Sequence, residues 1–485
     1  MYKHTITSAL AGLVLLLLHL YYRQRQRNVA ARKNGYGPVV KHWTKEPFLA
    51  FDFQMAMHTE IPILYRNHRK RGHTFQPRAL MGGSTILTIA PANLRAISTG
   101  KDWGIESMRL PGMDYFCGRG MLTTDGELWN HSRKLWKPTF AKDNLLDLAF
   151  LSQQVDNLLA DLPADGTSTD LQPPLYTMFL NTSIVFLLGI DPTAGSDGAP
   201  HTPTEFITAF HDAMYYTMFR MLLGKAWCLV PQKKYLYACK VAHSYLDYYV
   251  DQVLDGGSRS TKTRSLLSTL AHQTNDRVYI RDQILQGMMA SQETISTLIG
   301  NACFLLSRNP QYWQELRGAA QDPRNSELNF DTLLDFKITR NILFETLRLF
   351  PVFPIMQRIA LQDVTLPEGG AANQDLPVFA PKGTVVTMSW YALHRDPSVF
   401  GDDVESFRPE RWESINPSQW EFMGFGGGNR ACMGQQKVLV EAAYVLMRFA
   451  QRYERLESRD SRAWEGELKL TCQSKHGCKV ALYCE

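Results

Sequence analysis

The chain has 485 residues, a net charge of +5 and 45% hydrophobic residues. Basic and acidic residues are interspersed, so the composition argues against a nucleic-acid-binding surface. The eight cysteines are too scattered for a disulfide framework and are typical of reduced thiols in a domain that faces the cytosol. No repeat or linker divides the middle of the sequence, and we therefore expect one large domain, mainly α with a smaller β region.

The N-terminus contains an apolar segment, Ile6 to Tyr22, of about 17 residues, which is short but sufficient to span a bilayer. Arginines follow the segment at positions 23, 25, 27 and 32, so the positive-inside bias keeps the rest of the chain in the cytosol. A cleaved secretory signal is the alternative, but such signals carry their positive charge before the apolar run. We predict a membrane anchor at residues 1–22, a basic and Gly/Pro-rich linker at 23–38 and the main domain at 39–485.

The first candidate functional residues along the chain are Trp129 and Arg133. They are four residues apart in a predicted helix and therefore share one face. At this spacing the aromatic side chain usually packs in the core and the basic side chain lies at the edge of the core, so the pair alone indicates no particular function.

Apolar residues at steps of three and four predict a long helix from Ile280 to Arg308. Its middle is polar, with Ser291, Gln292, Glu293 and Thr294 in sequence. Burying such groups is unfavourable without partners or water, so the notch suggests a functional site. The alternative is that the hydroxyls bond back to carbonyl groups of their own helix.

A second helix, predicted from about Thr339 to Phe350, contains Glu345 and Arg348, which are close enough on one face to meet. The segment Phe407–Trp412, which reads Phe-Arg-Pro-Glu-Arg-Trp, follows later in the chain. A lone Glu-x-x-Arg motif is weak evidence of a functional site, because most such pairs are solvated ion pairs.

The most informative motif is the glycine-rich loop from Phe425 to Gly434, which holds Cys432 directly before a predicted helix at about 435–452. Thiolates bind metals, and consecutive glycines let the backbone approach a flat ligand closely. The N–H groups at the start of the following helix favour a negative sulfur. A surface loop with a structural cysteine is the alternative.

These motifs, in this order, resemble those of the cytochromes P450. The loop fills the family pattern F-x-x-G-x-R-x-C-x-G at Phe425, Gly428, Arg430, Cys432 and Gly434. The resemblance implies the P450 fold and a haem b cofactor with Cys432 as the axial ligand of its iron. The residues implied to bind the haem, mostly its propionates, are Trp129, Arg133, Arg358 and Arg430, together with Phe425, Gly428 and Gly434 of the loop.

The resemblance also implies roles for the two helices. Glu293 and Thr294 would organise proton delivery, although Ser291 stands where the family usually has glycine. Glu345 and Arg348 would form a buried network with an arginine of the later motif, for which we expect Arg408.

The implied function is that of a membrane-anchored haem-thiolate monooxygenase that takes electrons from NADPH through cytochrome P450 reductase, with cytochrome b5 as an optional second donor. Details such as His73-Thr74-Phe75 resemble the fungal microsomal hydroxylases of alkanes and fatty acids. We therefore expect an apolar substrate, either a fatty chain or a fungal secondary metabolite, and single-pass anchoring in the endoplasmic reticulum. A haem-thiolate isomerase or dehydratase that does not use dioxygen, or a non-catalytic haem protein, remains the alternative.

Overall fold

The computed structural model describes residues 33–46, 50–78, 85–192, 198–255 and 265–484, together with the single positions Gly12, Tyr22 and Val29. These residues form two compact units, each assembled from segments that are distant in sequence. The sheet unit comprises the described residues of 1–54, 66–103 and 357–389, and the helical unit those of 55–65, 104–356 and 390–485. The chain passes between the units several times, which explains why the sequence contains no linker between them.

The predicted membrane anchor at Ile6 to Tyr22 lies outside the described residues, apart from Gly12 and Tyr22. In the part of the chain that the structure describes, no helix combines the length and the apolar character needed to cross a bilayer.

The sheet unit is built on a six-stranded sheet of order β1-β2-β3-β9-β6-β4. Strand β3 runs antiparallel to β2, with Thr74 opposite Thr88, and parallel to β9. The buried Asn93 on α4 donates to the Thr88 hydroxyl and to the Glu368 carbonyl, because a buried amide needs partners. The elements are β1 (Val40–Trp43), α2 (Phe51–Thr59), α3 (Ile63–Arg71), β2 (Thr74–Arg78), β3 (Thr85–Thr88), α4 (Pro91–Thr99), β4 (Trp103–Gly104), β6 (Ile355–Ala360), β7 (Val364–Gly370), β8 (Leu376–Ala380) and β9 (Val385–Ser389), of which α2, α3, β4 and β6 reach across the unit boundary.

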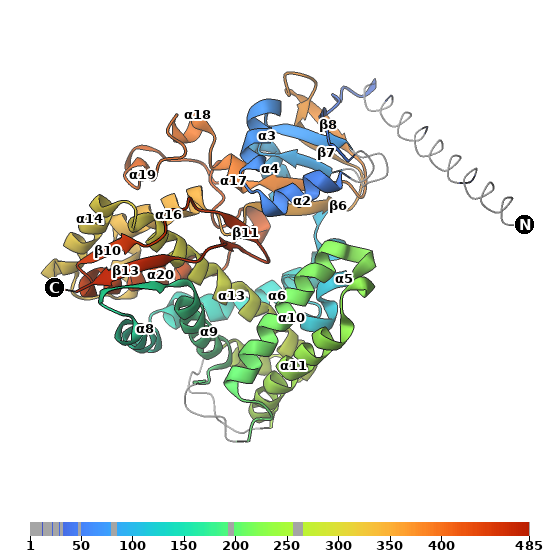
Figure 1. The fold of residues 1–485 in the computed structure, drawn as a ribbon. Coiled ribbons are helices and arrows are strands. Elements are labelled where there is room, and N and C mark those ends of the chain that lie inside the picture. The colour runs from blue at the N-terminus through green and yellow to red at the C-terminus, as the bar shows by residue number, and fades with distance from the viewer. Residues whose placement is uncertain are drawn as a thin grey trace, which may run out of the picture. The chain divides into compact units, whose positions relative to one another are not determined.

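The helical unit is organised around α13 (Arg277–Leu306), which packs against α9, α11, α16 and α20 (Figure 1). Helix α13 begins where the Asp276 side chain accepts a hydrogen bond from the Tyr279 N–H. It is buried over most of its length. The predicted helices at 280–308, 339–350 and 435–452 are confirmed as α13, α16 and α20, with ends that shift by at most a few residues.

The other helices of this unit surround α13, and its strands form a three-stranded sheet of order β10-β13-β5 and a hairpin of β11 and β12. The α-helices are α5 (Glu106–Cys117), α6 (Gly126–Trp136), α7 (Lys142–Leu145), α8 (Ala149–Asp161), α9 (Gln172–Leu188), α10 (Pro203–Leu223), α11 (Gln232–Leu254), α12 (Leu266–Ala271), α14 (Pro310–Gln321), α15 (Phe330–Asp335), α16 (Lys337–Leu349), α17 (Trp390–Leu393), α18 (Pro397–Phe400), α19 (Arg411–Ser414) and α20 (Gln435–Arg452). The 3-10 helices are η1 (Lys137–Phe140), η2 (Gly224–Leu229), η3 (Pro323–Asn325) and η4 (Gly428–Arg430), and the strands are β5 (Asp165–Asp170), β10 (Arg455–Ser458), β11 (Gly466–Leu468), β12 (Cys472–Ser474) and β13 (Lys479–Tyr483).

Helices α5 and α10 approach each other at backbone distance. A Cβ atom on Gly112 of α5 would lie 2.6 Å from the backbone nitrogen of Met221 on α10. Only glycine permits this contact, because real Cβ atoms do not come so close to backbone atoms. On α10, Phe206 and Phe210 are fully buried, and Phe206 stacks on Tyr245 of α11 at 4.3 Å between ring centroids. These α10 aromatics therefore belong to the core.

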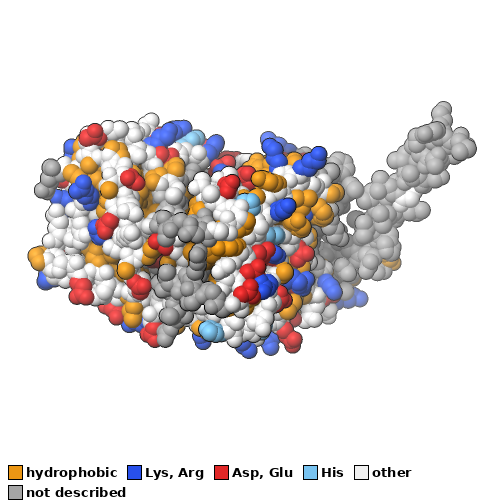
Figure 2. Space-filling view, turned by 90° about the horizontal axis from the view of Figure 1, so that it is seen from below, with side chains coloured by type: hydrophobic (Ala, Val, Ile, Leu, Met, Phe, Trp, Pro, Cys, Tyr) orange, Lys and Arg blue, Asp and Glu red, His pale blue; other side chains and the backbone are white. Residues whose placement is uncertain are grey.

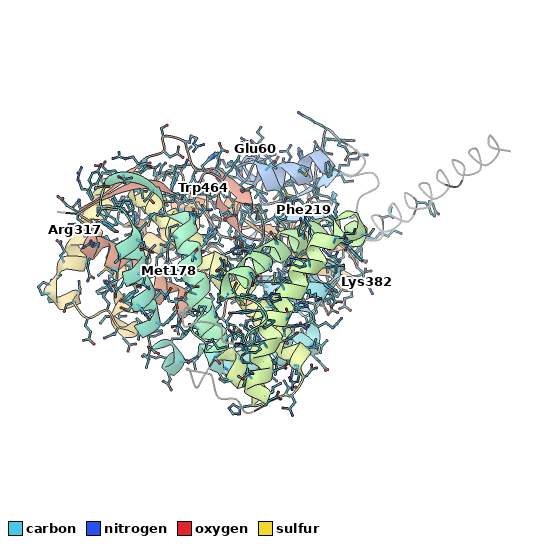
Figure 3. The ribbon with its side chains drawn as sticks, turned by 60° about the horizontal axis from the view of Figure 1, so that its bottom comes forward. Glu60, Met178, Phe219, Arg317, Lys382 and Trp464 are labelled. Carbon is cyan, nitrogen blue, oxygen red and sulfur yellow. The ribbon has the colours of Figure 1, made fainter. Side chains whose placement is uncertain are left out.

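Side-chain chemistry on the molecular surface agrees with the mixed composition. On the face shown in Figure 2, Lys and Arg side chains are interspersed with Asp and Glu over the described residues. Figure 3 labels Met178 on α9 and Phe219 on α10 in the helical unit, and Met178 is buried.

Candidate functional site

The cysteine loop folds as a tight turn that presents its thiol at the start of α20. The Cys432 N–H donates to the Phe425 carbonyl at 2.9 Å and closes the loop. Gly426 and Gly428 adopt φ values of 72° and 65°, which residues with a Cβ rarely do. A Cβ on Gly427 would lie 2.9 Å from the Trp420 ring. Each glycine of the run thus has a local structural reason, and the turn leaves one side of the loop open.

Cys432 is exposed. Burial nevertheless raises the pKa of its thiol, while a backbone hydrogen bond from Gly434 and the positive charge of Arg133 lower it. Both observations hold if the sulfur faces an opening that is itself surrounded by protein. Such a thiol is accessible to a bound group in a site that is shielded from bulk water. Binding to a metal ion removes the proton of the thiol.

Trp129 and Arg133 lie beside the cysteine loop, on α6. The Arg430 guanidinium is centred 4.6 Å from the Trp129 ring, and that of Arg133 is 5.8 Å away. Arg133 donates to the Ala431 carbonyl at 3.3 Å, and Arg430 pairs with Asp125 at 2.8 Å. The structure therefore brings together three of the residues predicted to bind propionates.

Arg109 on α5 belongs to the same cluster and was missed by the sequence analysis. Burial and the nearby charges of Arg109 and Arg133 together lower the pKa of Arg430 to about 10, against the opposing effect of Asp125. Burial also lowers the pKa of Arg109, which donates to the Leu122 carbonyl at 3.0 Å. No family motif contains Arg109, and the only hint in the sequence is a lone base in the otherwise apolar run from Met108 to Met113.

Helix α13 has one accessible turn in its centre. Residues 282–289 and 295–306 are buried, whereas Ala290, Ser291, Glu293 and Thr294 are partly exposed. Residues 290 and 294 are one turn apart and lie on one face. The polar notch predicted from the sequence therefore opens onto accessible space in the middle of a buried helix.

The two predicted proton-delivery residues have different partners. The Thr294 hydroxyl donates to the Ala290 carbonyl at 2.9 Å, which is the back-bonded arrangement weighed in the sequence analysis. Its oxygen lone pairs remain able to accept a hydrogen bond. The Glu293 carboxyl accepts from the Thr471 hydroxyl at 3.1 Å, and burial raises its pKa. Ser291 donates to Ser183 of α9 at 2.9 Å, so this departure from the family pattern ties α13 to α9.

The Glu345 network is buried, but its second arginine is not the one predicted. Glu345 accepts two hydrogen bonds from Arg348, at 2.8 and 2.9 Å. The Arg411 guanidinium donates at 3.1 Å and the Trp412 indole at 3.0 Å. The prediction of Arg408 is wrong for the side chain, which is about half exposed and pairs with acids at the surface. Arg408 contributes only its backbone N–H, at 3.0 Å, because the chain turns inward between these two arginines.

Arg358, the remaining predicted propionate ligand, belongs to the sheet unit, on β6. It is nearly buried and donates to the Gln357 carbonyl at 2.8 Å.

The residues of the helical unit fit a haem. Asp125 is the neighbouring acid of Arg109 and Arg430, while Arg133 faces Cys432, so three guanidinium groups have one carboxylate among them and the cluster suits a ligand with two carboxylates. The accessible thiol of Cys432 suits the iron.

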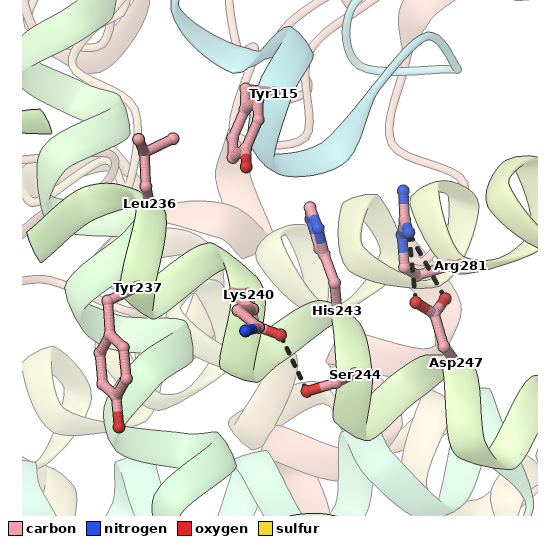
Figure 4. A pocket seen from close by; sticks show the side chains of 8 residues that line it. All are labelled: Tyr115, Leu236, Tyr237, Lys240, His243, Ser244, Asp247 and Arg281. Carbon is pink, nitrogen blue, oxygen red and sulfur yellow. Dashed lines mark hydrogen bonds and ion pairs between the residues drawn. The ribbon is translucent and has the colours of Figure 1, made fainter. Parts of the chain in front are cut away.

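A second pocket lies on the surface of the helical unit, between α5, α11 and α13 (Figure 4). It has a volume of about 450 Å³ and is lined by exposed side chains such as Tyr115 and Tyr237. Arg281 in this pocket is paired with Asp247 at 3.4 Å, and the pocket contains none of the residues described above.

Comparison with known proteins identifies the family. The family model described as Cytochrome P450 matches residues 53–475. The chain belongs to the cytochrome P450 family. It is similar to the cytochrome P450 monooxygenase fsdH of Fusarium heterosporum, with 33% identity over 99% of this chain and 88% of the relative. The cytochrome P450 monooxygenase himC of Aspergillus japonicus is 34% identical over 99% of this chain and 91% of its own length.

Yeast proteins also match, among them cytochrome P450 52A3-B of Candida maltosa, with 32% identity over 77% of this chain and 76% of that protein. The crystal structure of the cytochrome P450DA heme domain superposes with a TM-score of 0.76 at 19% identity, covering 93% of this chain and 98% of that one, and supports the fold. The resemblance to fungal cytochromes P450 is thereby confirmed. This cytochrome P450 is a monooxygenase, an oxidoreductase that incorporates molecular oxygen.

Proposed function

We propose that this cytochrome P450 inserts one oxygen atom from dioxygen into an apolar substrate at a haem b held by Cys432. The observation that carries the proposal is the accessible Cys432 thiol in surroundings that desolvate it, beside a cluster of arginines. When bound, the haem supplies the oxidation chemistry, and the protein positions it and controls access of water and protons.

The cysteine loop and the arginine cluster would hold the cofactor. Cys432 would bind the haem iron, and the backbone of Phe425, Gly428 and Gly434 shapes the loop around it. Arg133 and Arg430, which both lie over the Trp129 ring, would bind the propionates, since guanidinium forks match carboxylates. Arg109 joins this group on the strength of its charge and position, and Arg358 is proposed from the family resemblance.

Glu293 and Thr294 would supply protons at the accessible turn of α13. Burial raises the pKa of Glu293, and its carboxyl group can donate a proton when protonated. The Thr294 hydroxyl can pass a proton on by exchanging the one it shares with the Ala290 carbonyl.

The substrate class is a fatty chain or a fungal secondary metabolite, since a fold and a haem site do not by themselves fix the substrate. The electron source is NADPH through cytochrome P450 reductase, with cytochrome b5 as an optional second donor. The proposed location is the endoplasmic reticulum membrane, single-pass and with the catalytic domain in the cytosol, as the apolar run Ile6 to Tyr22 and its following arginines suggest.

The ligand assignment is tested by the absorbance of the reduced, carbon-monoxide-bound protein. We expect the red-shifted Soret band of a thiolate ligand in the wild type and in Cys228→Ala, a matched control with an equally exposed cysteine. Cys432→Ala should lose the band. An unshifted band in the wild type, or a red-shifted band that survives in Cys432→Ala, would show that Cys432 is not the ligand.

Turnover separates the monooxygenase from the isomerase or dehydratase alternative. Candidate substrates are first screened by the spin-state shift of the haem and then incubated with reductase, NADPH and isotopically labelled dioxygen. One labelled oxygen atom in the product, with NADPH required, is expected. Product formation without NADPH or dioxygen would favour the alternative.

A further inference from the structure

Helix α13 carries a stripe of polar residues that continues beyond its accessible turn. Glu293, Thr297 and Asn301 are each four residues apart and therefore lie along one face. Thr297 and Asn301 are buried, at 3% and 2% exposure, in a part of the helix whose neighbours are apolar. Buried polar groups at a regular spacing require partners at the same spacing.

The two ends of this stripe are bonded to one segment, residues 464–474, which contains the hairpin of β11 and β12. Glu293 accepts from the Thr471 hydroxyl at 3.1 Å. Asn301 accepts from the indole N–H of Trp464, which is labelled in Figure 3, at 3.0 Å. Each end of the stripe is thus bonded directly to the hairpin segment.

The middle of the stripe reaches the hairpin through α9. Thr297 shares a hydrogen bond of 3.0 Å with the phenol of Tyr176, and that phenol donates to the Gln473 side chain. Gln473 also accepts from Gln172 at 3.1 Å. Three connections therefore fix the register of the hairpin segment on α13.

Thr471 stands at the end of this array that is nearest the accessible turn. It is fully buried, where a valine of the same shape would pack equally well, so its hydroxyl has a use other than filling space. The turn around it is fixed by backbone bonds, since the Lys469 N–H donates to the Thr471 carbonyl at 2.9 Å and the Cys472 N–H to the Val352 carbonyl at 2.8 Å.

We propose that Thr471 is a positioning residue that holds the Glu293 carboxyl group at the accessible turn of α13. This inference rests on the proposed function for the role of Glu293, but not for the contact itself.

The arrangement has an electrostatic consequence. Burial raises the pKa of Glu293, while the Thr471 hydrogen bond and the charge of Lys469 lower it. The titratable phenol of Tyr176 lies near Glu293 on α9, and burial raises its pKa, so it is neutral; it donates its hydrogen bond to Gln473. Because Thr471 stabilises the ionised carboxylate, removal of its hydroxyl should raise the pKa of Glu293 further.

The test uses infrared difference spectroscopy on the resting holoprotein, with Thr471→Val as the variant. The carboxyl band of Glu293 is identified by its loss in Glu293→Gln. In Thr471→Val we expect the band at higher wavenumber, because one hydrogen bond is lost, and the pH midpoint of its titration should rise. The ratio of product formed to NADPH consumed should reach half of its maximum at a pH that rises together with this midpoint.

Trp464→Phe is the matched control, because it removes the connection to Asn301 and keeps the stacking on Phe350 at 4.2 Å. This control should leave the Glu293 band in place. An unmoved band in Thr471→Val, or an equal shift in Trp464→Phe, would overturn the inference. If Glu293→Gln leaves coupling unchanged while Thr471→Val still moves the band, the inference stands and the proton role of Glu293 in the proposed function fails.

Discussion

The Glu345 network makes a sharp prediction, because two arginines of the same motif differ in burial. Arg411 is 5% exposed and bonded to Glu345, whereas the Arg408 side chain is 48% exposed. We predict that Arg411→Met destabilises the protein and that Arg408→Met, its matched control, leaves stability nearly unchanged. Both substitutions remove one positive charge and retain a long side chain.

The expected loss follows from what Arg411 leaves behind. Removing one partner of a buried ion pair costs about 3–5 kcal/mol. Glu345 retains its two bonds from Arg348, which places the loss near the lower value, about 3 kcal/mol. A chain of 485 residues unfolds with an entropy of about 1 kcal/mol/K if each residue contributes about 2.1 cal/mol/K. The thermal midpoint should therefore fall by about 3 °C if the whole chain unfolds together.

Thermal unfolding of the holoproteins, followed by far-ultraviolet circular dichroism at one scan rate, measures this difference. The fraction of protein that retains haem after purification should fall in Arg411→Met as well, because the network is part of the same unit as the cysteine loop. Equal midpoints for the two variants, or a larger fall in Arg408→Met, would refute the reasoning.

Two further predictions concern the arginine cluster and acid stability. Arg109→Ala should lower the ratio of haem to protein after purification several-fold. The control Arg119→Ala removes an exposed cation of the same segment and should leave the ratio unchanged. Equal ratios in both variants would exclude Arg109 from haem binding. Burial lowers the pKa of both His68 and His394 from 6.5 to about 3, so their stabilising effect is complete above pH 6.5 and is lost as the pH falls toward 3. Between about pH 6 and 4, the unfolding free energy of His394→Gln should depend on pH less steeply than that of the wild type, and the slopes should differ by about 1.4 kcal/mol per pH unit. Denaturant titrations at several pH values measure these slopes. Identical slopes would contradict a neutral buried His394.

The features that the sequence predicted well are local in the chain. The long apolar periodicity around α13 and the spacing of the cysteine loop are set by residues within a few turns of one another, so helix and loop are both found where expected. The polar notch at Glu293 and Thr294 is visible for the same reason, because four polar residues interrupt an apolar helix.

The features that could not be predicted depend on contacts between distant segments. The motif at residues 407–412 contains both Arg408 and Arg411, and only the course of the turn decides which side chain reaches Glu345. Arg109 has no motif, and its role follows from the proximity of Arg430, far along the chain. The bond from Thr471 to Glu293 joins positions 178 residues apart.

The close contact of α5 and α10 has a mechanical consequence. With Gly112 against the backbone of Met221, the two helices have no side-chain layer between them in which to slide. A displacement of α10 would therefore carry α5 with it as one body. Because Arg109 is part of α5, a movement of α10 would also move this arginine through the contact at a single glycine.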